Sequence, residues 1–294
     1  MIPKEILKKV RQIHIRTRNM VSDVFAGQYH SVFKGQGIEF QEVREYVPGD
    51  DIRSIDWNVT ARTGHPYIKK FTEERELTVM LLVDISASHV FGSSAQLKKN
   101  LAAEIAAVLA FAAIQNNDRV GLILFTDEIE GYIPPKKGLA HVLRVIREVL
   151  YFQPKRRGTR IIPALDFLNH VMTRKTVTFL ISDFMVDENI RRSLAVTGKR
   201  HDLVGVIIGD KREKAWPAAG IVDWVDAETG RRYLVDTSNP EVRRTLGTAH
   251  TQRRQALVSL FRTSGLDVIE VNAGESYARE FIKFFKARER RLRT

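Results

Sequence analysis

The sequence has 294 residues and no cysteine, which excludes disulfides, zinc–thiolate sites and thiol nucleophiles. The lack of disulfides fits a reducing compartment, so we expect a cytoplasmic protein. Long apolar runs are also missing: residues 101–114 form the longest, and Glu104 interrupts it, while charges are scattered through residues 1–20. The sequence therefore predicts neither a transmembrane segment nor a signal peptide.

Motifs of common enzyme classes are missing as well. The chain has no Gly-x-x-x-x-Gly-Lys-Ser/Thr loop and no Gly-x-Gly-x-x-Gly turn after a strand, so no motif predicts nucleotide binding. No Gly-x-Ser-x-Gly turn frames a serine nucleophile. An aspartyl nucleophile usually has a second acid two residues later, where Ser86 follows Asp84. We therefore expect a protein that is not an enzyme, with a metal-dependent hydrolase as the lesser alternative.

Charge of one sign dominates, with 47 Lys and Arg against 35 Asp and Glu and a net charge of +12. This balance favours encounter with nucleic acid, anionic lipid or an acidic protein surface. Basic side chains cluster at Lys155, Arg156, Arg157 and Arg160, and again at Arg288, Arg290, Arg291 and Arg293. Neither cluster is interleaved with aromatic residues that stack on bases. Nucleic-acid binding is the alternative function that these clusters leave open.

Three regions follow one another along the chain. Apolar residues recur at helical spacing near the start, so residues 1–26 are predicted to form an N-terminal amphipathic helix. Residues 27–75 contain short β-like pieces and many turns, and predict a small β-rich module in which Trp57 packs beneath the strands. Residues 76–294 alternate strands with helices and form the main predicted domain.

The main domain is predicted to have an α/β fold with a mostly parallel central sheet. Buried strands alternate with helices, as is typical of sheets whose crossover connections are helical. Strands are expected at residues 77–84, 119–125, 176–182, 203–209, 234–236 and 266–271. Helices are expected at residues 95–115, 138–150, 162–173, 188–199, 241–263 and 276–293.

Two strongly apolar strands end on an aspartate. One ends on Asp84, with Ser86 and Ser88 two and four residues behind it, and the other is followed by Asp183. Strands of this kind commonly lie side by side at the switch point of a parallel sheet, where ligands bind at the carboxyl edge. Two carboxylates about 4 Å apart repel by roughly 4 kcal/mol at an effective dielectric near 20. A proton or a cation must therefore lie between them.

The hydroxyl groups favour the cation. Ser86 and Ser88 can offer oxygens to the same point, and Thr159, just before a helix, can reach over the crevice from a neighbouring loop. Hard cations prefer oxygen ligands, which Mg²⁺ arranges octahedrally. The predicted ligands of Mg²⁺, or of Mn²⁺ or Ca²⁺ in its place, are Asp84, Ser86, Ser88, Thr159 and Asp183.

This order of residues resembles the metal-ion-dependent adhesion site of von Willebrand factor type A domains, with Asp-x-Ser-x-Ser, a distant Thr and a distant Asp. Residues 118–125 resemble the second strand of that fold, and Gly158 with Thr159 resembles its threonine loop. The resemblance implies a Rossmann-like von Willebrand factor A domain that binds other proteins through a metal. We expect an acidic side chain of the partner to complete the coordination. The side chains expected to draw it to the crevice are Lys155, Arg156 and Arg157.

A second resemblance covers residues 35–71, whose sequence is GQGIEFQEVREYVPGDDIRSIDWNVTARTGHPYIKKF. This segment is similar to the opening of a widespread bacterial family, that of domain of unknown function fifty-eight, in which it precedes a von Willebrand factor A domain. Members of the family often accompany ATPases of the MoxR type, AAA+ machines thought to act as chaperones. The resemblance implies an adaptor for such an ATPase in the assembly or activation of other complexes.

Overall fold

The computed structural model describes residues 23–33, 39–72, 76–90 and 97–293. Most of the helix predicted at residues 1–26 lies outside the described residues. The chain divides into two compact units, one of residues 33–77 and one of residues 1–32 together with 78–294. In the described parts of the chain, no helix is long and apolar enough to cross a membrane.

The larger unit is built on a six-stranded sheet. Its strands are β3 (Thr78–Asp84), β4 (Arg119–Phe125), β5 (Ile129–Lys136), β6 (Val177–Ser182), β7 (Asp202–Gly209) and β10 (Asp267–Asn272). They lie in the order β10-β7-β6-β3-β4-β5, and all neighbours are parallel except β4 and β5. This is the order of a Rossmann-like doubly wound sheet, whose switch point lies between β3 and β6.

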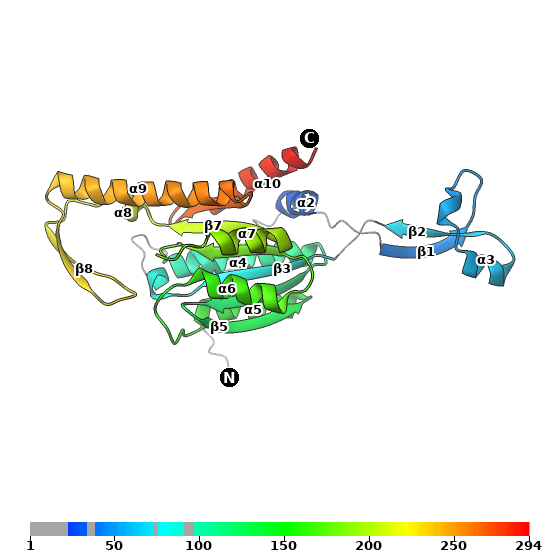
Figure 1. Cartoon of the computed structure of the whole chain (residues 1–294), viewed down its shortest axis with the longest axis horizontal. Helices are drawn as coiled ribbons and strands as arrows, with labels where there is room; N and C mark the ends of the chain where they lie inside the picture. Colours follow the sequence, from blue (N-terminus) through cyan, green and yellow to red (C-terminus); the bar gives the residue numbers. More distant parts are fainter. Residues whose placement is uncertain (1–22, 34–38, 73–75, 91–96, 294) are drawn as a thin grey trace. The chain divides into compact units, whose positions relative to one another are not determined.

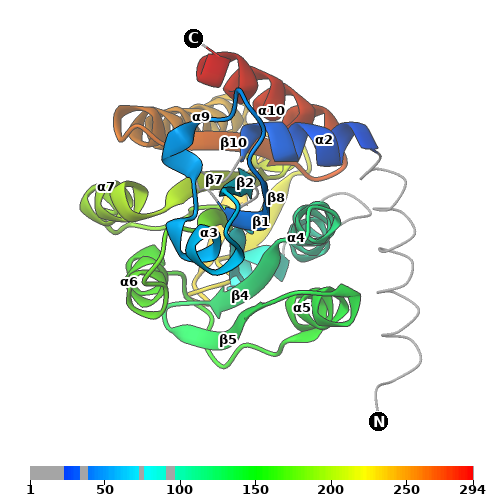
Figure 2. The same cartoon turned by 90° about the vertical axis from the view of Figure 1, so that its right-hand side faces the viewer.

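Helices cover both faces of this sheet, which confirms the predicted α/β class. They are α2 (Asp23–Val32), α4 (Lys98–Gln115), α5 (Leu139–Tyr151), α6 (Ile161–Val171), α7 (Arg191–Arg200), α8 (Lys211–Lys214), α9 (Pro240–Thr263) and α10 (Tyr277–Arg293). Figure 2 shows α4 and α5 on one face and α6 and α7 on the other. The apolar residues of α4 are buried around almost its whole circumference, because it packs against the sheet, α5 and α2.

Two strands of the larger unit and the short helix α8 were not predicted, and α2 extends into residues predicted to belong to the β-rich module. The other strands and helices of this unit lie close to their predicted ranges. β5 contains Pro134 and Pro135, which weaken the sequence signal of a strand but are tolerated because β5 is an edge strand. β8 (Ile221–Val225) pairs with β9 (Arg232–Asp236) in a separate hairpin whose side chains are mostly exposed. Without a buried face, β8 has no apolar alternation by which the sequence reveals a strand.

Helix α2 belongs to the larger unit, so the compact units divide the chain at residue 33 rather than at the predicted residue 27. The buried Tyr29 hydroxyl donates a hydrogen bond to Asp118 Oδ2 at 3.1 Å, and the Tyr29 ring meets Phe285 of α10 edge-on. Burial and the charge of Asp118 raise the pKa of Tyr29. These contacts fix α2 against the body of the larger unit.

The smaller unit has little apolar interior. Its elements are β1 (Glu39–Glu45), the 3-10 helix η1 (Ile52–Ser54), α3 (Trp57–Thr63) and β2 (Tyr67–Thr72). Arg44 donates to both carboxylate oxygens of Asp50, at 2.9 and 2.7 Å, and Asp56 caps α3. Trp57 is 67% exposed, so the prediction that it packs beneath the strands is wrong. A two-stranded sheet and a short helix offer no layer deep enough to cover an indole ring.

Candidate metal-binding site

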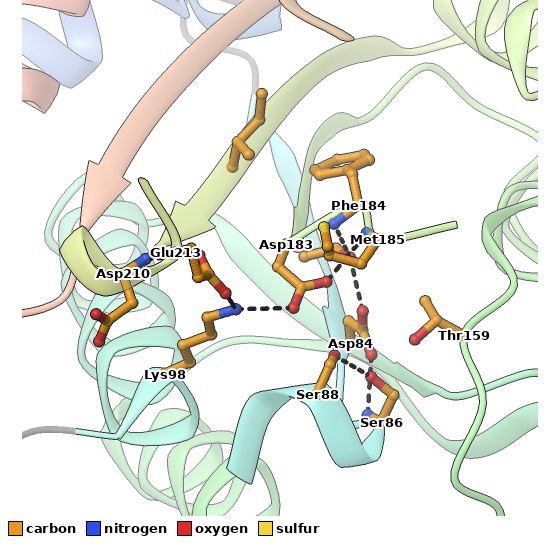
Figure 3. Close-up of polar contacts among 12 residues, drawn as sticks. Asp84, Ser86, Ser88, Lys98, Thr159, Asp183, Phe184, Met185, Asp210 and Glu213 are labelled. Carbon is orange, nitrogen blue, oxygen red and sulfur yellow. Dashed lines mark hydrogen bonds and ion pairs between the residues drawn. The ribbon is translucent and has the colours of Figure 1, made fainter. Parts of the chain in front are cut away.

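Asp84 and Asp183 lie at the carboxyl edge of the larger sheet, at its switch point. Asp84 ends β3, Asp183 directly follows β6, and the two strands are parallel neighbours. Both carboxylates are buried. The structure thus brings the two predicted carboxylates together, as Figure 3 shows.

Two hydrogen bonds orient the carboxylate of Asp84. Its Oδ1 accepts from the backbone N–H of Ser86 at 2.9 Å, and its Oδ2 accepts from the Ser182 hydroxyl at 2.6 Å. The Ser182 oxygen accepts in turn from the N–H of Phe184 at 2.9 Å. Each oxygen of an ionised carboxylate can accept more than one bond, so both remain suited to binding a cation.

The two serines behind Asp84 face each other. The hydroxyl oxygens of Ser86 and Ser88 are 2.9 Å apart, and Figure 3 shows both beside Asp84. The N–H of Ala87 donates to the carbonyl oxygen of Arg157 at 3.0 Å. This bond ties the serine turn to the loop that carries Thr159.

Thr159 enters the site from the loop before α6. The N–H of Arg160 donates to the carbonyl oxygen of Thr126 at 3.0 Å, which anchors the loop just beyond the end of β4. Thr159 is buried, and its hydroxyl oxygen lies on the side facing Asp84 in Figure 3. The five residues predicted as ligands therefore occupy one place in the structure.

The chain turns sharply after Asp183, where Phe184 adopts a left-handed φ of 55°. A bulky side chain rarely adopts this conformation, which costs about 1–2 kcal/mol. The hydrogen bond to Ser182 supports it, and the Phe184 ring packs edge-on against Phe261 with centroids 5.4 Å apart. Asp183 Oδ1 accepts from the N–H of Met185 at 3.2 Å, so the turn also orients the second carboxylate.

A buried lysine, which the sequence did not predict, contacts Asp183. The Nζ of Lys98 lies 3.1 Å from Asp183 Oδ2 and also hydrogen-bonds Glu213 of α8. Burial alone would lower the pKa of Lys98, but the charges of Asp183 and Glu213 outweigh it and raise the pKa. Lys98 therefore places a fixed positive charge beside the predicted cation position.

A third carboxylate, Glu228, reaches the site from the turn between β8 and β9. The Thr159 hydroxyl donates to Glu228 Oε1 at 2.7 Å. Burial, and after it the charges of Asp84 and Asp183, raise the pKa of Glu228, although the bond from Thr159 opposes this shift. Sequence reasoning missed Glu228 because a polar turn between exposed strands carries no signal of burial.

The donor set fits a hard divalent cation. It consists of two carboxylates and three hydroxyls, and oxygen donors of this kind suit Mg²⁺ and Mn²⁺. The described residues contain no cluster of three or more His, Asp or Glu side chains placed to hold a metal ion, so the hydroxyls are indispensable to such a site. Lys98 shares Asp183 with any bound cation, which leaves Asp84 as the carboxylate on which cation binding depends most.

The basic loop before Thr159 is exposed, but its charges are not equivalent. Arg156 pairs with Glu128 at 2.9 Å. The backbone N–H groups of Lys155 and Arg156 both donate to Glu130. Lys155 and Arg157 therefore offer most of the charge that the sequence assigned to the rim of the crevice.

Part of the C-terminal basic cluster has a structural role. Arg288 of α10 pairs with Asp202 of β7 and, at 2.9 Å, with Asp267 of β10. Arg291 pairs with Asp267 at 2.6 Å. These ion pairs fasten α10 to the edge of the sheet, so they do not favour nucleic-acid binding by this cluster.

A family match covers most of the chain. The family described as "Protein of unknown function DUF58" matches residues 42–256. The chain is also similar to "Uncharacterized protein Rv1480" of Mycobacterium tuberculosis (strain ATCC 25618 / H37Rv), with 28% identity over 285 residues. These 285 residues cover 96% of this chain and 89% of that protein.

Two solved structures are similar at low sequence identity. An aerotolerance-related membrane protein from Bacteroides fragilis NCTC 9343, with multiple mutations to serines, is 15% identical with a TM-score of 0.48, over 72% of this chain and 99% of that chain. The conserved hypothetical protein BatB from Bacteroides thetaiotaomicron is 14% identical with a TM-score of 0.47, over 73% of this chain and 99% of that chain. The fold assignment rests on the strand order of the sheet itself.

Proposed function

The chain belongs to the family of proteins of unknown function DUF58, and we propose that it is a non-catalytic module that binds a protein partner through a divalent cation. The observation that supports this is the gathering of two buried carboxylates and three hydroxyls at the carboxyl edge of β3 and β6. In this proposal Mg²⁺ is the resident ion, and Mn²⁺ or Ca²⁺ can replace it.

The protein side chains prepare the site for an acidic group. A bound Mg²⁺ supplies a concentrated positive charge and keeps water in the positions that the protein leaves open. Ser86 and Ser182 hold the Asp84 carboxylate in one orientation, so it need not reorganise when the site fills. An Asp or Glu of the partner replaces a water, and Lys155 and Arg157 accelerate the encounter.

We propose a MoxR-type AAA+ ATPase as the partner. Family resemblance supports this identity, and the absence of a nucleotide-binding motif from this chain assigns ATP hydrolysis to the partner. The contact surface is the crevice around Asp84, the block of residues 35–71, or both. The module itself carries out no chemical step.

A binding experiment with the ATPase tests the proposal. Immobilised wild-type protein should retain the ATPase in Mg²⁺ and lose it in excess chelator, and Asp84→Ala should behave as the chelated protein does. Retention that is equal with and without chelator would contradict the role of the cation. Binding of RNA or DNA that ignores chelator and falls steeply with salt would favour the nucleic-acid alternative instead.

A further inference from the structure

The turn of the β8–β9 hairpin has a defined conformation. Asp226 Oδ1 accepts from the N–H of Glu228 at 2.9 Å and from the N–H of Thr229 at 3.1 Å, and Gly230 takes a φ of 71°. Side-chain bonds of this kind fix the direction of a turn. Glu228 is therefore presented in one orientation by the backbone that carries it.

The side chain of Glu228 points toward the candidate metal-binding site. Its neighbours on the tip, Ala227 and Thr229, are exposed, whereas Glu228 is half-buried. Its Oε1 accepts from the Thr159 hydroxyl at 2.7 Å, and its Oε2 lies 4.0 Å from the position that a Cβ would take on Gly158. Both carboxylate oxygens thus lie against the loop that supplies the predicted threonine ligand.

The charges that act on Glu228 are negative. Asp84, Asp183 and Asp226 all repel its ionised form. Among the described residues, Glu228 does not form a cluster with Asp84 and Asp183 that is placed to hold a metal ion; it reaches the site through Thr159, and a cation beside Thr159 would stabilise its ionised form. Glu228 therefore lies beside the predicted cation position, hydrogen-bonded to one of the predicted ligands.

Away from its tip, the hairpin is held by an edge-on contact between Trp224 and Trp216, whose ring centroids are 5.4 Å apart. β8 and β9 form their own two-stranded sheet outside the six-stranded one, and Figure 1 shows β8 standing apart from the larger sheet. Ile221 is 72% exposed and Leu234 is 79% exposed. The base is pinned where the N–H of Thr237 donates to the carbonyl oxygen of Gly220 at 2.8 Å. Since an isolated two-stranded hairpin is only marginally stable, its tip can leave Thr159 while the base stays fixed.

We propose that Glu228 is an internal ligand of the metal site. Its carboxylate occupies the coordination position that an acidic side chain of the partner must take. The inference rests on the proposed function, because it requires a cation between Asp84 and Asp183. The partner binds only when the hairpin has withdrawn Glu228, so its apparent affinity is reduced by the fraction of molecules in the open state. With about one molecule in ten open, removal of the Glu228 carboxylate raises the affinity for an external carboxylate about tenfold.

Bound Mn²⁺ and acetate provide probes for this competition. The purified full chain is loaded with Mn²⁺, the waters on the ion are counted by water-proton relaxation, and the binding of ¹³C-labelled acetate is followed by its paramagnetic relaxation. The variants are Glu228→Gln and Glu228→Ala, with Asp223→Asn as the matched control. Asp223 is an acid on the same hairpin that pairs with Arg232, so its loss changes the charge equally without altering the site.

The expected result is that both Glu228 variants gain a water on Mn²⁺ and bind acetate about tenfold more tightly, whereas Asp223→Asn behaves as wild type. If Asp84→Ala abolishes Mn²⁺ binding while the Glu228 variants keep the wild-type water number and acetate affinity, the metal site stands and the internal-ligand inference is overturned. If the wild-type protein binds no Mn²⁺, the proposed function and this inference both fail.

Discussion

The Nζ of Lys98 lies 3.1 Å from Oδ2 of Asp183, and each of these side chains is only 2% exposed. A buried ion pair contributes little net stability, but removal of one partner leaves an uncompensated charge in a poorly solvated place. Lys98 therefore places a positive charge beside Asp183 whether or not a cation is bound, and it links the predicted metal site to Glu213 on α8.

Replacement of Lys98 should destabilise the protein strongly. Lys98→Met leaves both Asp183 and Glu213 without their ammonium partner, so we expect the free energy of unfolding to fall by about 3–5 kcal/mol in urea denaturation without metal. Added Mn²⁺ should recover part of this loss, since a ligand that binds only the folded state stabilises it. The matched control is Lys99→Met, because Lys99 is the half-buried neighbour of Lys98 in the same helix and its amine donates to the Phe152 carbonyl oxygen at 3.2 Å; its loss should cost about 1 kcal/mol. Equal losses in the two variants would contradict the importance of the buried pair.

His201 gives the fold a defined dependence on pH. Burial, and after it the charge of Arg200, lower the pKa of His201 from its usual 6.5 to about 4. The Nδ1 atom accepts from the N–H of Thr176 at 3.3 Å, a bond that the neutral ring makes and the protonated ring loses. The unfolded chain takes up this proton near pH 6.5 and the folded chain near pH 4. The stability contribution is therefore complete above about pH 6.5 and is lost as the pH falls to about 4.

Urea denaturation across this pH range measures the effect. We expect His201 to account for about 2–3 kcal/mol of the fall in the free energy of unfolding between pH 6.5 and pH 4. His201→Asn keeps an acceptor for the Thr176 N–H and cannot be protonated, so its curve should be flatter by that amount. Parallel curves for the two proteins would show that His201 is not the titrating group.

The exposed loop before Thr159 should control the rate of partner association. Because Arg156 already pairs with Glu128, we expect Lys155→Ala with Arg157→Ala to slow association with the MoxR-type ATPase and to flatten its salt dependence, and Arg156→Ala to change it less. The matched control is Arg174→Ala with Lys175→Ala, which removes the same charge from the opposite edge of the sheet, just before β6. Surface plasmon resonance at several salt concentrations measures these rates. If the control pair of substitutions slows association equally, the slowing comes from the change in net charge and not from the position of the loop.

The buried parts of the fold could be predicted because their residues repeat with the period of their structure. β3, β4, β6 and β7 are almost continuous apolar runs, as parallel strands covered on both faces must be. β5 and β8 lack this signal, since one is an edge strand with two prolines and the other lies in an exposed hairpin. Trp57 was misplaced for a related reason: a large apolar residue indicates burial only where the surrounding unit has a core to bury it.

The candidate site was predictable only in part. Asp84, Ser86 and Ser88 lie close together in the sequence at the end of a predicted strand. Asp183 directly follows another predicted strand, and Thr159 lies just before a predicted helix. Lys98, Glu213 and Glu228 come from separate elements, and their contacts depend on long-range packing that no local pattern encodes. The five predicted positions therefore came from the sequence, and the ion pair and the third carboxylate came from the structure.

Calorimetric titration with Mn²⁺ tests the central claim most directly, through a comparison of the wild type with Asp84→Asn. The asparagine keeps the size of Asp84 and an acceptor for the Ser182 hydroxyl, so circular dichroism should show the same fold. The account predicts one site in the wild type and an affinity at least about 100-fold lower in the variant, because even the loss of an outer partner costs about 10- to 100-fold. Equal Mn²⁺ affinity in two equally folded proteins would contradict a metal site at Asp84.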